Sequence, residues 1–232
     1  MSEISENTAS VLARVTAAAL AAGRDPAGIT VVAASKMNDA GRVREAFAAG
    51  IGVFGENRVQ EMLEKNRLGA YDGARLHFIG RLQRNKVRQV VGTAELIHSA
   101  DSLPLIAEID RCAGKASLIQ DILLEVNIAG EESKGGFDPG DVSSVLDAVS
   151  AFGNVRVRGL MAIPPICSDP LDNVPFFESM TKLFVDNSIK KYDNVSMDFL
   201  SMGMSGDFEA AIACGANMVM IGSAIFGPRN YN

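Results

Sequence analysis

Eight short β-rich runs alternate with segments of helical periodicity along most of this 232-residue chain. Runs of this kind pair in parallel and are joined by right-handed crossovers through the intervening helices. Glycines follow several of the helical segments, as expected just past a helix end. We expect the strands at 29–35, 52–56, 75–80, 96–101, 121–128, 155–163, 197–203 and 218–226.

Eight strand–helix units with no linker between them predict a single α/β domain over residues 1–232, folded as one closed (β/α)8 TIM barrel of small size. An open, doubly wound sheet is the alternative. It is disfavoured because no Gly-x-Gly-x-x-Gly follows the first strand, where a dinucleotide-binding fold carries one. Residues 1–24 predict an extra N-terminal helix packed on the barrel. The proline-rich segment 163–177 predicts a surface loop over one mouth.

Composition excludes several classes of function. The net charge of −6 argues against a nucleic-acid partner, whose binding surface is normally basic. We interpret the basic stretch 83–88 as the solvated face of a helix, although a partner or anion surface stays open. His77 and His98 are the only histidines, which leaves little material for a zinc site or a Ser-His-Asp triad. The N-terminus lacks signal-peptide character and no apolar run could span a membrane, so we expect a cytoplasmic protein.

Polar and small residues stand where the predicted strands end, the face that carries the active site in barrels of this kind. The seventh and eighth strands end in "SMGMS" and "IGSAIFG". Their glycines and serines allow a ligand to approach the backbone, and these two loops are a frequent phosphate site. Ordinary turn chemistry is the alternative. The candidate site residues are Lys36, Asn57, His77, Met161, Ser201, Gly203, Met204, Ser205, Met220, Gly222 and Ser223.

Lys36 directly follows the apolar run "VVAAS" and is the candidate reactive residue of the site. A lysine that leaves a buried strand inside a barrel mouth is partly desolvated, which lowers its pKa and favours attack of the neutral amine on a carbonyl. A Schiff-base lysine facing a phosphate site predicts pyridoxal 5'-phosphate as the cofactor. The alternative is a strand-end lysine whose amine simply reaches water.

Six ordered segments also resemble one known family: "VVAASKMN", "FGENRVQE", "HFIGRLQRNK", "RGLMAIPP", "LSMGMSGDFEAAI" and "MVMIGSAIFGPRNY". The chain is similar, from residue 29 to residue 231, to the YggS/PROSC family of pyridoxal phosphate homeostasis proteins. The resemblance implies a barrel of the alanine-racemase N-terminal type with the cofactor bound covalently to Lys36. It also implies phosphate contacts from the two Gly/Ser segments, a neighbouring contact from Asn57, a secondary contact from Lys134, and His77 beside the cofactor ring.

One position departs from the family. Where relatives carry an arginine directed toward the pyridine nitrogen, this chain has Met220, in "MVMIGSA". A thioether cannot donate a hydrogen bond. The ring nitrogen must therefore meet water, another partner or an apolar contact.

The resemblance favours a carrier that holds and releases pyridoxal phosphate without turnover, with apo-enzymes that need the cofactor as possible recipients. An amino-acid racemase is the alternative, but racemisation needs a base on each face of the substrate Cα. Related racemases take one base from a C-terminal domain that is not expected here, and Tyr71, Tyr192 and Tyr231 fall at no predicted strand end. That domain also supplies a dimer interface, so we expect a monomer. An aldolase that uses Lys36 directly lacks an acid–base partner.

Overall fold

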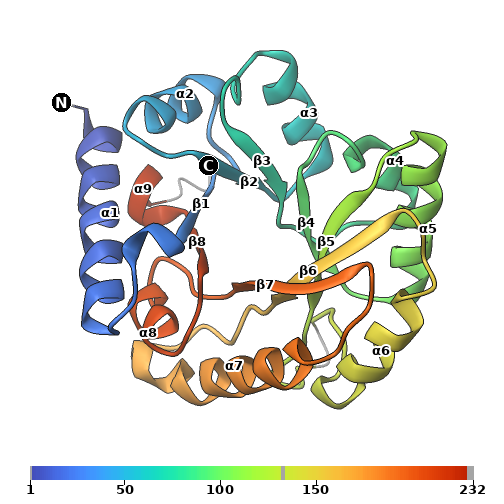
Figure 1. Cartoon of the computed structure of the whole chain (residues 1–232). Coiled ribbons are helices and arrows are strands. Elements are labelled where there is room, and N and C mark those ends of the chain that lie inside the picture. The colour runs from blue at the N-terminus through green and yellow to red at the C-terminus, as the bar shows by residue number, and fades with distance from the viewer. Residues whose placement is uncertain (1, 132–133, 229–232) are drawn as a thin grey trace.

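The computed structural model describes residues 2–131 and 134–228. Figure 1 shows a ring of strands surrounded by helices. The eight strands are parallel and close into a barrel in sequence order, with β1 hydrogen-bonded to both β2 and β8, as predicted. The strands are β1 Thr30–Ala34, β2 Val53–Glu56, β3 Arg75–Phe78, β4 Leu96–Ala100, β5 Gln120–Glu125, β6 Val155–Met161, β7 Val195–Ser201 and β8 Met218–Ile221.

Helices cover the outside of the barrel. The predicted N-terminal helix is confirmed as α1, which packs on α8 and α9 through the buried stripe Ile4, Val11, Val15 and Ala19. This spacing places one apolar face of the helix against the barrel. The helices are α1 Glu3–Ala21, α2 Ala40–Ala48, α3 Val59–Arg67, α4 Val87–Val90, α5 Leu103–Lys115, α6 Val142–Val149, α7 Val174–Ser188, α8 Phe208–Ala213 and α9 Ser223–Phe226.

The core has two parts, separated by the barrel wall. The larger part lies between the strands and the helices, because alternate residues of each strand point outward. The smaller part fills the barrel itself, so the barrel is packed rather than hollow below its mouth. Its buried members are Val32, Val53, Ile79, Leu96, Leu123, Met161, Met218 and Met220.

Two predicted elements differ from the structure. The strand expected over 218–226 ends at Ile221, and Ser223–Phe226 forms α9, whose Ile225 and Phe226 are buried against the helical layer. Apolar residues at this point therefore reflect a buried helix, which a short apolar run does not distinguish from a strand. The loop expected over 163–177 ends earlier, because α7 begins at Val174 with a proline in its first turn, where no backbone N–H is needed.

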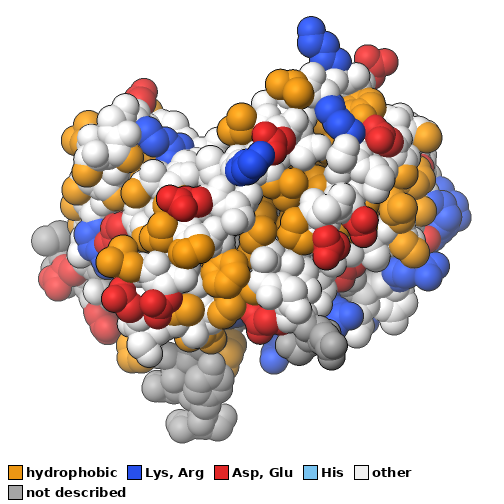
Figure 2. Space-filling model, turned by 90° about the horizontal axis from the view of Figure 1, so that it is seen from below, with side chains coloured by type: hydrophobic (Ala, Val, Ile, Leu, Met, Phe, Trp, Pro, Cys, Tyr) orange, Lys and Arg blue, Asp and Glu red, His pale blue; other side chains and the backbone are white. Residues whose placement is uncertain are grey.

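The surface carries charges of both signs. Figure 2 looks at the molecule from below Figure 1, where α7 lies, and shows acidic and basic side chains around a band of hydrophobic ones. Leu171, Val185 and Ile189 are exposed in and beside α7. Arg84 and Arg88 of the basic stretch are exposed too, as its interpretation as a solvated face predicts. Among the described helices, none combines the length and hydropathy needed to cross a membrane.

Candidate functional site

A cavity of about 230 Å³ opens at the C-terminal end of the barrel strands. Lys36 stands on its wall just after β1, and Asn57 just after β2. The loops after β7 and β8 form another part of the wall, and Met220 of β8 lies between the mouth and the packed interior. The structure therefore brings together these predicted site residues: Lys36, Asn57, Met204, Ser205, Met220, Gly222 and Ser223.

The loops after β7 and β8 are joined through one hydroxyl group. Ser205 Oγ accepts hydrogen bonds from the backbone N–H of Gly222 at 3.1 Å and of Ala224 at 3.3 Å. Its own hydrogen is then available to donate to a ligand. Within the part of the chain that the structure describes, the N–H groups of Ser205, Gly206 and Ser223 donate to no protein acceptor. Donors from two loops thus surround one end of the cavity, an arrangement that suits an anion.

Asn57 has a buried polar atom that lacks a partner. Its side-chain Oδ1 is shielded from solvent and makes no hydrogen bond to the described residues. Asn57 is held by a close crossing of the chain after β3, where a Cβ on Gly80 would lie 2.3 Å from the Asn57 carbonyl oxygen. A buried acceptor on a cavity wall normally has a donor, so this oxygen marks a place for a ligand or water.

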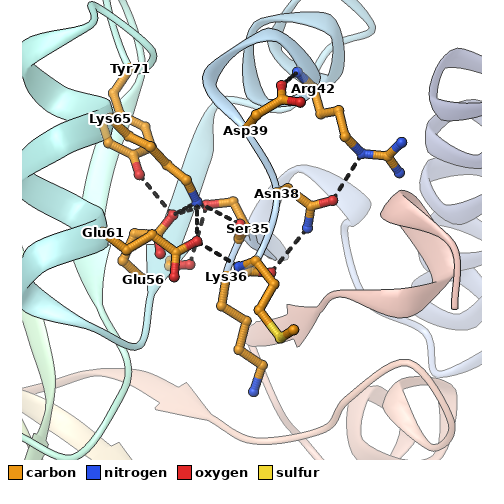
Figure 3. Close-up of polar contacts among 11 residues, drawn as sticks. Ser35, Lys36, Asn38, Asp39, Arg42, Glu56, Glu61, Lys65 and Tyr71 are labelled. Atoms are coloured by element: carbon orange, nitrogen blue, oxygen red, sulfur yellow. Dashed lines mark hydrogen bonds and ion pairs between the residues drawn. The ribbon is translucent and has the colours of Figure 1, made fainter. Parts of the chain in front are cut away.

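Lys36 lies in a tight turn between β1 and α2. The next residue, Met37, has a φ of 63°, a left-handed conformation that is uncommon for a residue other than glycine. Asn38 Nδ2 donates to the Lys36 carbonyl oxygen at 3.1 Å, and Arg42 Nε donates to Asn38 Oδ1 at 2.9 Å. Arg42 also donates to the carbonyl oxygen of Phe226 at the end of α9. Figure 3 shows the links from Lys36 through Asn38 to Arg42. The contact of Arg42 with Phe226 ties the lysine turn to α9, which follows β8.

A buried charged cluster lies beneath this turn, between β1, β2 and α3. Lys65 Nζ donates to the Ser35 carbonyl oxygen at 2.7 Å, to Glu56 Oε1 at 2.7 Å and to Glu61 Oε1 at 2.6 Å. Ser35 Oγ and Tyr71 Oη donate to the same Glu56 oxygen at 2.6 and 2.7 Å. Burial, and then the charge of Glu56, raise the pKa of Tyr71 well above its ordinary value, so its hydroxyl stays protonated.

Two predicted site residues lie inside the barrel instead of on the cavity wall. His77 Nδ1 is 3.0 Å from His98 Nε2, and His98 Nδ1 is 3.1 Å from Ser201 Oγ. Burial lowers the pKa of His77 to about 3, with a smaller contribution from Arg75, and lowers the pKa of His98 as well. The chain His77–His98–Ser201 is therefore neutral, and contact of His77 or Ser201 with a cofactor stays a prediction.

Three more predicted residues lie beside the cavity. Met161 belongs to the packed interior of the barrel. Gly203 has a φ of +93°, and a Cβ there would lie 2.6 Å from the Ala211 side chain, so the glycine lets α8 pack closely. Lys134 Nζ donates to the carbonyl oxygen of Ile163, a residue of the cavity wall, at 3.3 Å and pairs with Glu131 at 2.6 Å. Direct cofactor contact by these three stays a prediction.

Sequence reasoning missed the charged cluster. Ser35 is 30 residues from Lys65 in the chain, and the motif "FGEN" does not by itself show that Glu56 is buried beside them. Two signals were present: a glutamate inside a strand that is otherwise apolar, and the pair Glu61 and Lys65 at helical i, i+4 spacing. The spacing predicts an exposed helix pair, whereas Lys65 is buried.

The fold and the cavity define a parallel (β/α)8 barrel protein whose mouth is lined by a lysine and by backbone and hydroxyl donors from the loops after β7 and β8. The family model described as "Alanine racemase, N-terminal domain" matches residues 9–230. The chain belongs to this family and, within it, to the pyridoxal phosphate homeostasis proteins, as the following relatives show.

A protein of Aquifex aeolicus named pyridoxal phosphate homeostasis protein is 42% identical over 97% of this chain and 98% of its own length. One of the same name from Pseudomonas aeruginosa is 43% identical over 100% of this chain and 98% of its own. The solved structure of PipY from Synechococcus elongatus, with PLP bound, superposes with a TM-score of 0.83 at 32% identity, covering 97% of this chain and 100% of PipY. The resemblance stated from the sequence is thereby confirmed.

Proposed function

We propose that this protein binds pyridoxal 5'-phosphate as a Schiff base on Lys36 and serves in the homeostasis of that cofactor, without catalytic turnover of its own. One observation carries the proposal: Lys36 and the donors around Ser205 and Gly222 line the same cavity. The names of the relatives and the PLP-bound PipY structure support the choice of cofactor.

The residues of the cavity suit each end of this cofactor. Lys36 would hold the cofactor's aldehyde as a Schiff base, with the loss of one water, and an incoming amine would release it by exchange. Ser205 and the N–H groups of Gly206 and Ser223 offer donors to the phosphate. Met220 offers the ring an apolar contact where the family carries an arginine, so this residue leaves the pyridine nitrogen without a charged partner.

The positions of the tyrosines favour a carrier over a racemase. Racemisation needs a second base in reach of the substrate Cα. Tyr71 is bound to Glu56 outside the barrel wall, and Tyr192 donates to Asp147. Tyr231 lies outside the described residues. No tyrosine among those described lines the cavity. The partners we propose are the cofactor and apo-enzymes that accept it by amine exchange, with the protein acting as a monomer.

Replacement of the attachment residue tests the function. We expect the Lys36→Ala protein to fold normally. It should lack the absorption band of the bound cofactor and give no covalent adduct after reduction with borohydride. Lys182→Ala serves as the matched control, because Lys182 is exposed and pairs with Asp186 on α7, and it should retain the adduct on Lys36. The measurement is mass spectrometry of the reduced, digested protein. An adduct of undiminished yield in Lys36→Ala would contradict the proposal.

A further inference from the structure

The turn that carries Lys36 has a conformation that its own sequence does not favour. Met37 has a φ of 63° although it has a Cβ, and it is neither asparagine nor aspartate, the residues that adopt this region most readily after glycine. Backbone in such a region persists when surrounding contacts determine it. The contacts around the turn should therefore show what holds it.

Two side chains of α3 hold the peptide groups on either side of Lys36. Lys65 Nζ donates to the Ser35 carbonyl oxygen at 2.7 Å, and Glu61 Oε1 accepts from the Met37 N–H at 2.5 Å. Glu61 and Lys65 are also paired with each other at 2.6 Å. One ion pair on one helix thus fixes both the peptide bond that enters Lys36 and the one that leaves it.

Glu56 and its donors fix Lys65 in turn. The side chain of Glu56 is 0% exposed and that of Lys65 6% exposed, so their ion pair at 2.7 Å is screened little by water. Ser35 Oγ and Tyr71 Oη complete the contacts of the same Glu56 oxygen. Lys65 is therefore held at the end of β1 by partners from the residue that follows β1, from β2 and from α3.

The lysine side chain itself extends away from this cluster (Figure 3), and Glu61 and Lys65 contact its turn through backbone atoms. We infer that Glu61 and Lys65 are positioning residues: they hold the turn at Ser35–Met37 so that the Lys36 amine points into the cavity. This inference rests on the proposed attachment of the cofactor to Lys36. It adds that the rate of attachment is set by a charged cluster that does not touch the cofactor.

Glu61 offers a clean test because its side chain is only partly buried, 20% exposed. Glu61→Gln keeps an oxygen that can accept from the Met37 N–H, whereas Glu61→Leu, of similar size, does not. We expect Glu61→Gln to form the borohydride-fixed adduct on Lys36 within about threefold of the wild-type rate, and Glu61→Leu at least about tenfold more slowly (an order-of-magnitude expectation for a misplaced reacting group). In the cofactor-free protein, amide hydrogen exchange of the peptide that contains Met37 should be faster in Glu61→Leu alone.

Glu108→Leu is the matched control. Glu108 is 21% exposed, lies on α5 and pairs with Arg111 at i, i+3, so it reproduces the loss of a half-buried helical ion pair away from Lys36. It should form the adduct at the wild-type rate. If Glu61→Leu also does so, with unchanged exchange at Met37, the positioning inference is wrong. If the wild-type protein forms no adduct on Lys36, the proposed function fails instead, and the exchange measurement still tests whether Glu61 holds the turn at Met37.

A second variant covers the case in which Glu61→Leu does not fold. The double variant Glu56→Gln with Lys65→Met removes both charges of the buried pair together. The carboxylate that it leaves without a cation is that of Glu61, which is 20% exposed. It should fold and form the adduct at least about tenfold more slowly than wild type. A folded double variant that reacts at the wild-type rate would overturn the inference.

Discussion

Two buried polar networks lie near the barrel mouth, on opposite sides of the barrel wall. Outside the wall, Glu56, Lys65 and Glu61 form a charged cluster with Ser35 and Tyr71. Inside it, His77, His98 and Ser201 form a chain whose histidines are neutral because burial lowers their pKa values. The outer network bonds to the backbone next to Lys36, whereas the inner chain is formed by contacts between side chains.

The charged cluster outside the barrel wall and the neutral chain inside it suit different roles. A charged cluster makes strong, directional bonds and can hold a backbone turn in a disfavoured conformation, but each charge in it depends on its partner. A neutral chain satisfies polar atoms in the barrel interior without the cost of burying a charge. The two networks should therefore respond differently to substitution and to pH.

The largest expected effect comes from breaking the charged cluster. Lys65→Met leaves Glu56 buried without its cation, and we expect the free energy of unfolding to fall by about 3–5 kcal/mol. Urea unfolding at pH 7 measures it, and Lys182→Met, which breaks an exposed pair with Asp186, is the control that should change little. If the free energy of unfolding falls equally in the two variants, the buried ion pair of Lys65 and Glu56 does not stabilise the fold more than an exposed pair.

The neutral chain of His77, His98 and Ser201 should make the free energy of unfolding depend on pH. The folded pKa of His77 is about 3 and that of His98 is lowered too, so the native state excludes protons that the unfolded chain binds. This contribution to stability is fully present above pH 6.5 and is lost as the pH falls toward the folded values, at about 1.4 kcal/mol per pH unit for each histidine. Between pH 6.5 and 5, His98→Leu should lower the slope of the free energy of unfolding against pH by the contribution of one histidine.

Comparison of that variant with the wild type cancels the groups common to both. Among these is Glu125, whose pKa burial and Asp101 raise to about 7 and which therefore favours the folded state as the pH falls. Thermal or urea unfolding at several pH values gives the two slopes. Identical slopes would show that His98 takes up its proton in the folded protein as easily as in the unfolded chain.

The smallest expected effect is the difference in stability between losing one hydrogen bond of the charged cluster and losing one of the neutral chain. Tyr71→Phe removes a donor to the Glu56 carboxylate, and Ser201→Ala removes a partner of neutral His98. A hydrogen bond to a charged group contributes more than a neutral one, so Tyr71→Phe should cost about 1 kcal/mol more than Ser201→Ala. Urea unfolding of the two variants, side by side, measures the difference, and a larger loss for Ser201→Ala would reverse the ranking of the networks.

Much of the barrel could be predicted because its signals are local. Each strand is a short apolar run, each helix has its own periodicity, and the glycine positions after helices confirm the ends: Gly50, Gly69 and Gly215 all have positive φ values. The alternation of the elements then leaves few topologies. The prediction was wrong where a short apolar run fits both a strand and a helix: the apolar residues of α9 were expected to continue β8.

The amino-acid sequence by itself determined the parallel barrel, its N-terminal helix and the placement of Lys36, Asn57 and the Gly/Ser segments at one end of it, because strand ends in a parallel barrel share a face. Only the tertiary structure decided which polar residues meet. Lys65 reaches the carbonyl of Ser35, 30 residues earlier, and His98 reaches Ser201, 103 residues later. Residue type states what a side chain can bond to, whereas the partner depends on strand register and on which side of the wall each side chain lies.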